Sequence, residues 1–391
     1  VVLDNAGNNF SGTVTVANGA TLQIGSGSAN QARLPIGETP YVINGSLIIN
    51  ESSGGETING PLTGSGGVTV QSSQLTLTGD NSGFTGAIVA ADGATVNIDN
   101  TDIGAPLGGV ATGTTINTGA SLVANAQAAT VAEPVTLNGG TLRVGGGTSS
   151  KLNWSGNITV GAGGVAEIRQ EGGTDTPISN GLTLSGNVVG SAGESLRLRV
   201  DSGSTTVVTG NVQHNGGLIK NSTGRAELRG TNTFTGNTTI EGGTLALFGA
   251  ADLATSPRVE VQAGASLDAS GRTGGAIAIT SGRMLDVSGS VIGSTSTSSG
   301  GTISIGGDGA ATIGPRTVRF TPPLGTLGSN SDVRVRSGSG ANANQNDTQA
   351  LGLGSISATD SFRSLLTFDL ASTGISDPNY INDVALTLTL T

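Results

Sequence analysis

The residues best suited to acid–base chemistry on a polymer lie in one short stretch, AEIRQEGGTDTP. It contains three carboxylates, Glu167, Glu171 and Asp175, together with Arg169. Glycoside hydrolysis uses a pair of such carboxylates beside the scissile bond. In a strand whose side chains alternate between two faces, Glu167 and Arg169 share the solvent face. A solvated charged patch explains this arrangement better than a glycosidase pair does, so we predict no catalytic residue here.

Other catalytic and metal-binding chemistries lack the residues that they need. A nucleophilic triad requires a basic histidine, and the chain has one histidine, His214 in NVQHNGG, which we expect at an exposed corner. The chain has no cysteine, which excludes a zinc site of clustered Cys and His. GGDG at Gly306–Gly309 is half of a calcium-binding nonapeptide but occurs once. We predict a protein that is not an enzyme and has no cofactor, with calcium in Asp-containing loops as the weaker alternative.

The composition favours an elongated β protein with a thin core. Glycine accounts for 67 of 391 residues and aromatic residues for only 3%, so the core must consist of Val, Ile, Leu and Ala. Charged residues make up 11%, too few for a disordered, highly charged chain. The net charge is −10 and the sequence has no Lys/Arg cluster, so we predict no nucleic-acid partner. No apolar run approaches the length of a transmembrane helix, and none is expected.

Three segments of the chain repeat one design. They begin with Phe-Ser/Thr-Gly at Phe10–Gly12, Phe84–Gly86 and Phe234–Gly236, and an alternation of apolar residues and Thr follows. A Gly-Thr-Leu corner, or a close variant of it, then precedes a second alternation, as at Gly243 and Leu245. Repetition at this scale indicates a solenoid, in which each repeat is one structural unit that stacks on the next.

Short strands that end at Gly and Asn are typical of a right-handed parallel β-helix, which we predict for residues 1–315. At roughly 20–25 residues per coil, this region would form on the order of 14 coils. A β-sandwich is the alternative, but its strands rarely repeat one corner motif. The sequence pattern changes over residues 316–391, where Pro322–Pro323 interrupt it and strands are predicted at Ser364–Leu370 and Val384–Thr391. We predict a second, jelly-roll-like β domain there, either truncated or completed by a neighbouring subunit.

The repeated segments resemble the passenger-associated transport repeat, also called the autotransporter-associated β-strand repeat. The similarity is close over Gly224–Phe248 and looser over Leu3–Ile24 and Leu75–Ile98. That family occurs in long secreted bacterial β-helices, so the resemblance implies surface exposure and a stalk or filament role. The tail, through Asp332–Val335 and Arg363–Leu370, resembles the DNRLRE-type β domain of secreted bacterial proteins, some members of which bind carbohydrate.

These features predict an extracellular structural protein, a β-helical rod subunit of a bacterial surface fibre, sheath or biofilm matrix. A β-helix leaves strand edges open at its ends, and open edges pair with other chains. We expect head-to-tail self-association through strands that carry the apolar residues Val1, Val2, Leu3, Leu386, Leu388 and Leu390. The alternative function is a surface adhesin, in which the rod is a stalk and the tail domain binds a polysaccharide.

Overall fold

The structure is a computed structural model. It describes residues 1–5, 11–27, 34, 39–52, 54–99, 105–125, 129–145, 151–172, 181–274, 276–297, 300–306 and 310–313, and the strands at 335–337, 350–353, 362–367 and 386–389. Every regular element in these ranges is a β-strand, and they contain no helix. None of the described segments is therefore a helix long and apolar enough to cross a membrane. The predicted all-β class is confirmed.

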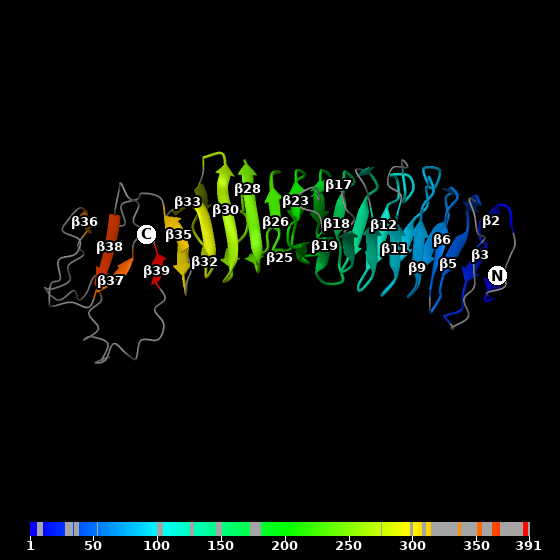
Figure 1. Cartoon of the computed structure of the whole chain (residues 1–391), viewed down its shortest axis with the longest axis horizontal. Helices are drawn as coiled ribbons and strands as arrows, with labels where there is room; N and C mark the ends of the chain where they lie inside the picture. The colour runs from blue at the N-terminus through cyan, green and yellow to red at the C-terminus, as the bar shows by residue number, and fades with distance from the viewer. Residues whose placement is uncertain are drawn as a thin grey trace. The chain divides into compact units, whose positions relative to one another are not determined.

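Three sheets of parallel strands form the sides of a solenoid (Figure 1). The first sheet has ten strands, in the order β1 (Val2–Leu3), β3 (Thr21–Ile24), β5 (Ser46–Ile49), β8 (Gly67–Val70), β10 (Ile88–Ala90), β12 (Thr114–Asn117), β15 (Val135–Asn138), β18 (Ile158–Val160), β21 (Val188–Gly190) and β24 (Val212–His214). The second sheet has 13 strands, in the order β6 (Gly55–Ile58), β9 (Gln74–Leu77), β11 (Thr95–Ile98), β13 (Ser121–Ala124), β16 (Thr141–Val144), β19 (Ala166–Gln170), β22 (Leu196–Val200), β25 (Leu218–Asn221), β27 (Thr238–Ile240), β29 (Arg258–Val261), β32 (Met284–Val287), β34 (Thr302–Ile305) and β39 (Leu386–Thr389).

The third sheet contains β14 (Ala129–Val131), β17 (Lys151–Trp154), β20 (Gly181–Leu184), β23 (Thr205–Val208), β26 (Arg225–Leu228), β28 (Gly243–Gly249), β30 (Ala265–Arg272), β33 (Ser290–Thr297), β31 (Ala276–Ile279) and β35 (Ala310–Ile313). In the first coils the third side is formed by a short sheet of β2 (Val14–Val16), β4 (Tyr41–Ile43) and β7 (Leu62–Thr63). Each sheet thus supplies one side of the coil.

The chain visits the three sheets in turn. It runs, for example, from β14 in the third sheet to β15 in the first, β16 in the second and β17 in the third. The number of residues between strand partners in successive coils varies from 18 (Met284 to Thr302) to 30 (Arg169 to Arg199). The solenoid has about 12 turns. This is slightly fewer than predicted.

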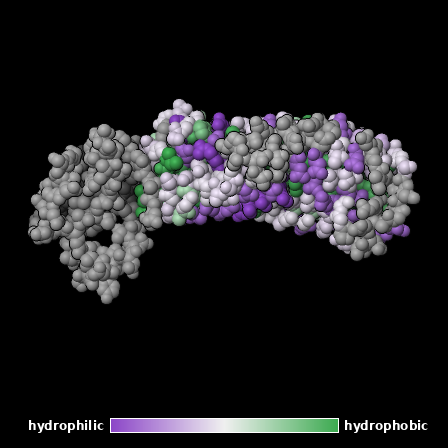
Figure 2. Space-filling model, in the orientation of Figure 1, coloured by the Kyte–Doolittle hydropathy of each residue, from purple (hydrophilic) through white to green (hydrophobic). Residues whose placement is uncertain are grey.

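The inward positions of the strands form aliphatic columns that run from coil to coil. In the second sheet Leu122, Leu142, Ile168 and Leu198 take one register position on consecutive strands, and all four are buried. Each coil therefore buries its apolar face against its immediate neighbours, which is how a solenoid is stabilised. The predicted parallel β-helical solenoid is confirmed. On the face shown in Figure 2, hydrophilic residues spread along much of the solenoid and hydrophobic residues form small separate patches.

Four large aromatic residues of the solenoid lie inside it. Tyr41, Phe84, Trp154 and Phe234 are all fully buried. They fill core volume and so present no ring face on which a sugar could stack.

The described residues divide into two compact units. The larger unit contains the solenoid strands and β39. The smaller contains β36 (Val335–Ser337), β37 (Ala350–Leu353) and β38 (Phe362–Thr367), which form an antiparallel sheet.

The strand β39 differs from expectation, since the strand at Val384–Thr391 was predicted to belong to the tail domain. It pairs antiparallel with β34, and Leu388 lies opposite Ile303. The pairing satisfies backbone groups of β34 on the side away from β32, where a free strand edge would otherwise remain.

Candidate functional site

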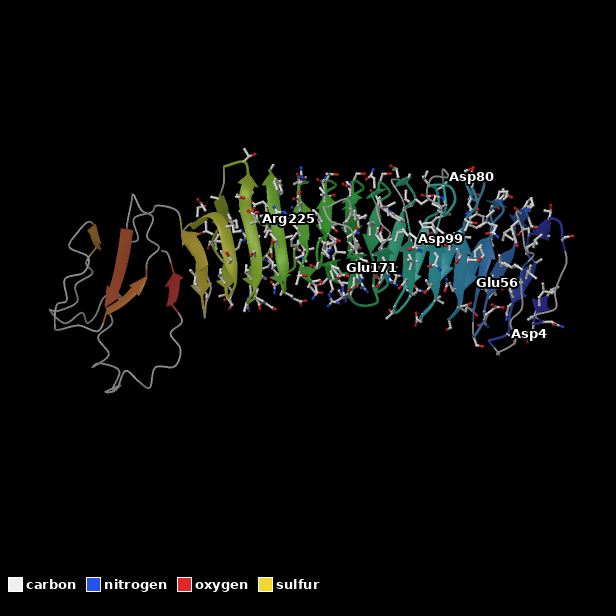
Figure 3. The ribbon with its side chains drawn as sticks, viewed as in Figure 1. Asp4, Glu56, Asp80, Asp99, Glu171 and Arg225 are labelled. Atoms are coloured by element: carbon white, nitrogen blue, oxygen red, sulfur yellow. The ribbon has the colours of Figure 1, made fainter. Side chains whose placement is uncertain are left out.

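The charged residues singled out in the sequence lie on the outward face of the second sheet. Along β19 (Ala166–Gln170) alternate residues point into the core, whereas Glu167 and Arg169 are half-buried on the outside. Glu171, labelled in Figure 3, follows directly after the strand. The predicted alternation is therefore present, and it brings Glu167, Arg169 and Glu171 to one face. Asp175 lies outside the described residues.

Three arginines stand in register on neighbouring strands of this sheet. Arg143 in β16 is the register partner of Arg169 in β19, which is the partner of Arg199 in β22. Adjacent strands lie about 4.8 Å apart, so the three side chains form a column of positive charge along the solenoid. We call Arg143, Arg169 and Arg199 the arginine ladder.

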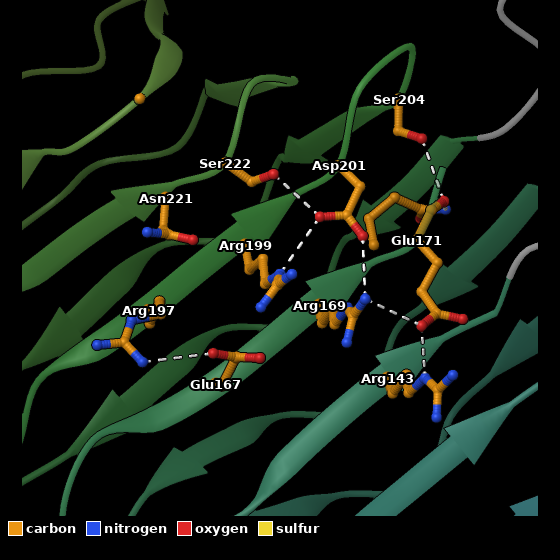
Figure 4. A network of polar contacts seen from close by, with 12 residues as sticks. Arg143, Glu167, Arg169, Glu171, Arg197, Arg199, Asp201, Ser204, Asn221 and Ser222 are labelled. Carbon is orange, nitrogen blue, oxygen red and sulfur yellow. Dashed lines mark hydrogen bonds and ion pairs between the residues drawn. The ribbon is translucent and has the colours of Figure 1, made fainter. Parts of the chain in front are cut away.

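Two carboxylates connect the rungs of the arginine ladder (Figure 4). The Glu171 Oε1 atom lies 2.7 Å from Arg143 Nε and 3.3 Å from Arg169 Nη2. The Asp201 carboxylate lies 3.2 Å from Arg169 Nη2 and 3.3 Å from Arg199 Nε. Charges therefore alternate across three coils, which offsets the repulsion among the stacked guanidinium groups.

The protonation of Asp201 fits a role in holding charge. Burial raises its pKa, but hydrogen bonds from Ser222, Arg199 and Arg169 outweigh burial and leave the pKa below its ordinary value. A general acid requires a raised pKa instead. Glu167 is paired with Arg197, its register partner, at 3.5 Å. All the described carboxylates of this face of β19 and β22 thus have an arginine partner, as a charged surface patch requires.

Most of this cluster was not predicted from the sequence. The predicted residues did not include Arg143, Arg197, Arg199 or Asp201. The prediction of no Lys/Arg cluster is wrong for the folded chain, since four arginines lie close together here. The available signal was an arginine two residues before an acid at a strand end, at Arg169 and again at Arg199. Recognising it required the register of the strands, which the sequence does not supply.

A second charged cluster lies on the third sheet. Arg225 binds Glu227 at 2.9 Å and Asp268 at 3.0 Å, and so links β26 to β30. The guanidinium carbons of Arg225 and Arg229 lie 5.6 Å and 4.7 Å from the ring centre of Phe248. Together these contacts connect side chains of three successive coils, β26, β28 and β30, and cation–π packing adds to the ion pairs.

No metal site is found in the part of the chain that the structure describes, where no three His, Cys, Asp or Glu residues form a group that could hold an ion. Asp4, Asp80 and Asp99 lie apart along the solenoid (Figure 3). Asp308, the acidic residue of the predicted calcium motif, lies outside the described residues.

His214 was expected at an exposed corner, and this expectation is wrong. Its side chain takes an inward position of β24, and the residue is only 2% exposed. The ring stacks on Phe234, with centroids 5.8 Å apart, and Nδ1 accepts a hydrogen bond from the Gly216 N–H at 3.1 Å. Burial lowers the pKa of His214 to about 4, against the opposite effect of the Glu194 backbone. A neutral ring in the core packs the solenoid and is inaccessible to a substrate.

Lys220 is a second buried base. It is fully buried at an inward position of β25, in a column that is otherwise aliphatic on both neighbouring strands. Its Nζ donates to the carbonyl oxygens of Asn221, Ser222 and Gly242 at 2.9, 2.7 and 3.0 Å. Burial lowers the pKa of Lys220 to about 8, although Asp201 favours the charged form. Lys220 therefore ties together the backbone of two successive corners.

The residues that define the sequence repeat are core and corner residues. Phe84 and Phe234 are fully buried. A Cβ atom at Gly86 would overlap the carbonyl oxygen of Gly66 in the preceding coil. Gly236 is also too close to the preceding coil for a Cβ. Gly12 and Gly243 have positive φ angles, and Leu245 is buried. Phe10 lies outside the described residues.

An asparagine ladder precedes three strands of the first sheet, and the sequence analysis missed it. The side-chain oxygen of Asn157 accepts the backbone N–H of Asn187 at 3.1 Å, and that of Asn187 accepts the N–H of Asn211 at 3.0 Å. Asn211 in turn accepts the N–H of Thr231 at 2.9 Å. Each asparagine thus satisfies a corner donor of the next coil. The signal was the triplet Ser/Thr-Gly-Asn before each strand.

The residues predicted for self-association have different surroundings. Val1 and Val2 are 83% and 54% exposed, and Leu3 packs against the core. Leu386 and Leu388 belong to β39, whose partner strand is β34. Leu390 lies outside the described residues.

Comparison with known protein families agrees with the repeat pattern and the fold. The family model of the passenger-associated-transport-repeat matches residues 1–24 and 218–247. The chain carries passenger-associated transport repeats. The second of them spans β25, β26, β27 and the start of β28, and it contains the buried Phe234. Passenger-associated transport repeats on a β-solenoid fit an autotransporter-passenger-like rod, and this family indicates a secreted or surface protein.

The comparisons go no further than these two segments. The looser repeat at Leu75–Ile98 lies outside the matched residues, and so does the tail that resembles the DNRLRE-type domain. No curated protein and no solved structure matches the chain.

Proposed function

We propose that this protein is an extracellular structural rod and that it serves as a subunit of a bacterial surface fibre, sheath or matrix. The observation that carries the proposal is the continuous ladder of the second sheet from β6 to β34, on a solenoid of about 12 turns. A solenoid of this kind extends in one dimension, because each coil contacts only its neighbours. On the outward face of the second sheet, the charges of the arginine ladder are held in ion pairs within the chain.

The contact proposed for assembly is between strand edges. Among the described strands β1 is hydrogen-bonded to β3 alone, and its neighbouring apolar side chains Val1 and Val2 are exposed. An exposed apolar edge is a template for another strand. We assign this edge to contact with the β34–β39 end of a second copy. A head-to-tail contact of this kind does not close on itself, so it produces a filament.

The test is assembly of the full chain, followed by sedimentation and electron microscopy. The unmodified protein should form filaments that return to a 38.1 kDa band under denaturing conditions. Val2→Lys places a charge at the proposed edge and should reduce assembly about tenfold or more. Val110→Lys is the matched control, because Val110 is 63% exposed in a turn away from any edge strand. A rod that stays monomeric at all concentrations, or equal assembly of the two variants, would contradict the proposal.

The adhesin alternative assigns glycan binding to residues 316–391. Of these the structure describes only the strands β36, β37, β38 and β39. Glycan binding by this part of the chain stays a prediction.

A further inference from the structure

The arginine ladder presents its positive charge outward. The side chains of Arg143, Arg169 and Arg199 are 44%, 29% and 39% exposed to solvent. Those of Glu171 and Asp201 are only 18% and 21% exposed. The carboxylates therefore lie deeper in the face of the second sheet, and the guanidinium groups form its outer layer. A ligand that approaches this face meets the arginines first.

The outer rungs of the ladder have hydrogen-bond donors to spare. Arg143 and Arg199 bind their carboxylates through Nε. Their terminal nitrogens, Nη1 and Nη2, form no hydrogen bond with any described residue. These nitrogens make up the planar fork with which arginine binds a carboxylate in two parallel hydrogen bonds. The two outer rungs can therefore each accept an anionic group without breaking an internal ion pair.

The charge balance of the patch also favours an anionic ligand. Arg197 adds a fourth guanidinium group beside the ladder, with 35% side-chain exposure. Four guanidinium groups face three carboxylates, Glu167, Glu171 and Asp201, so the patch is locally positive on a chain of net charge −10. A local excess of this sign attracts an anion even where the whole molecule does not.

We propose that the arginine ladder binds a linear carboxylated polysaccharide that lies along the solenoid axis. The rungs repeat at about 4.8 Å, the spacing of adjacent strands. The two outer rungs, Arg143 and Arg199, are two strands apart, which is about 9.6 Å. Two sugar units of an extended polysaccharide span a similar length, so alternate acidic sugars meet the two outer rungs. Contacts that are individually weak add up when they are made by one polymer chain. The choice of an extracellular polymer rests on the proposed surface rod, whereas the ladder geometry is independent of fibre assembly.

The variant for the test is Arg143→Gln/Arg199→Gln. Both carboxylates of the ladder then keep Arg169 as a partner, at 3.3 Å for Glu171 and 3.2 Å for Asp201, so the fold is retained. The probe is oligomannuronate, and its affinity for the full chain is measured by calorimetry at low and high salt. Each lost charge-assisted contact should weaken binding about tenfold, so the double variant should bind on the order of 100-fold more weakly and with a smaller salt dependence.

Two controls make the test specific. Arg258→Gln removes an arginine of the same sheet with 45% side-chain exposure, but Arg258 lies between two acids, Asp286 at 2.6 Å and Glu260 at 3.6 Å. Its affinity for oligomannuronate should match that of the unmodified protein. Uncharged oligomannose should not bind, since the ladder recognises carboxylates. Unchanged circular dichroism of both variants should confirm that each is folded.

Several results would overturn the proposal. These are no binding of oligomannuronate by the unmodified chain at low salt, an equal loss in Arg258→Gln, or equal binding of oligomannose. Tighter, ladder-dependent binding of polyphosphate, single-stranded DNA or anionic lipid vesicles would assign the patch to phosphate groups instead. Fibre assembly is scored by sedimentation without any ligand, so failure of one proposal is distinguishable from failure of the other.

Discussion

At the scale of single residues, the interior of the solenoid tolerates polar side chains where the coil turns a corner. Lys220 reaches three carbonyl oxygens of the corner backbone, and the buried Arg283 donates to the carbonyl oxygen of Ser256, in the turn before β29, at 2.9 Å. Corner carbonyls that no strand partner uses are the acceptors that a buried cation needs. His214 uses a different solution, because it stays neutral and stacks on Phe234.

The stability of the protein should depend on the protonation of His214. Its pKa in the folded state is about 4, below the ordinary value of 6.5, so only the unfolded chain takes up a proton as the pH falls below 6.5. The free energy of unfolding should therefore be highest above pH 6.5 and should fall by roughly 3 kcal/mol as the pH is lowered to 4. His214→Leu should remove this part of the pH dependence. Urea unfolding of both proteins across this pH range measures it, and an identical pH slope in the variant would refute the assignment.

At the scale of elements, the coils are held together by corners that come into backbone contact. Gly86 lies so close to Gly66 in the preceding coil that no side chain fits between them. Gly93, in the same coil as Gly86, has a positive φ angle and open space around it. The two glycines are therefore required for different reasons, one for close approach of the backbones and the other for its conformation.

Alanine substitution should separate these two roles. Gly86→Ala has to push two coils apart, and we expect a loss of about 3 kcal/mol or more in the free energy of unfolding. Gly93→Ala strains only its own backbone and should cost about 1 kcal/mol. Chemical denaturation of the two variants gives the comparison. Equal losses would mean that the corners of neighbouring coils are not in the contact described here.

At the scale of the whole solenoid unit, the second sheet is the continuous element, and β39 extends it. Every other strand pair of this sheet is parallel, whereas β39 and β34 are antiparallel. The strand β39 is therefore not a further coil but a separate strand added to the edge of the last one. The outer edge of β39, on the side away from β34, is the one that our assembly proposal assigns to the second copy.

A cysteine pair should test this strand pairing, because the chain has no cysteine of its own. Residues opposite each other in an antiparallel pair have Cα atoms about 5 Å apart, within the range that a disulfide spans. Oxidised Ile303→Cys/Leu388→Cys should therefore run as a cross-linked monomer on a non-reducing gel. Thr387 is the register partner of Ser304, one position away from Ile303, so Ile303→Cys/Thr387→Cys is the register control and should not cross-link. A cross-linked dimer would instead show that β39 pairs with a second copy, and no cross-link in either variant would refute the pairing.

The sequence by itself determined the class of fold. Alternating Val, Ile, Leu and Thr in short runs, corners rich in glycine and the repeated Phe84 and Phe234 segments together predict stacked parallel coils, because only like coils bury such faces on each other. These signals are local, which is why they survive in a single sequence. The number of turns was less accurate, and individual coil lengths, which range from 18 to 30 residues, follow no single repeat.

Only the tertiary structure decided which side chains meet. Arg143, Arg169 and Arg199 are separated by 26 and 30 residues, so no fixed period aligns them, and strand pairing alone brings them into register. The burial of His214 was decided in the same way, since a strand of three residues does not reveal which of its faces points inward. Register and facing are properties of the neighbouring coils, and they exist only once the backbone hydrogen bonds between coils have formed.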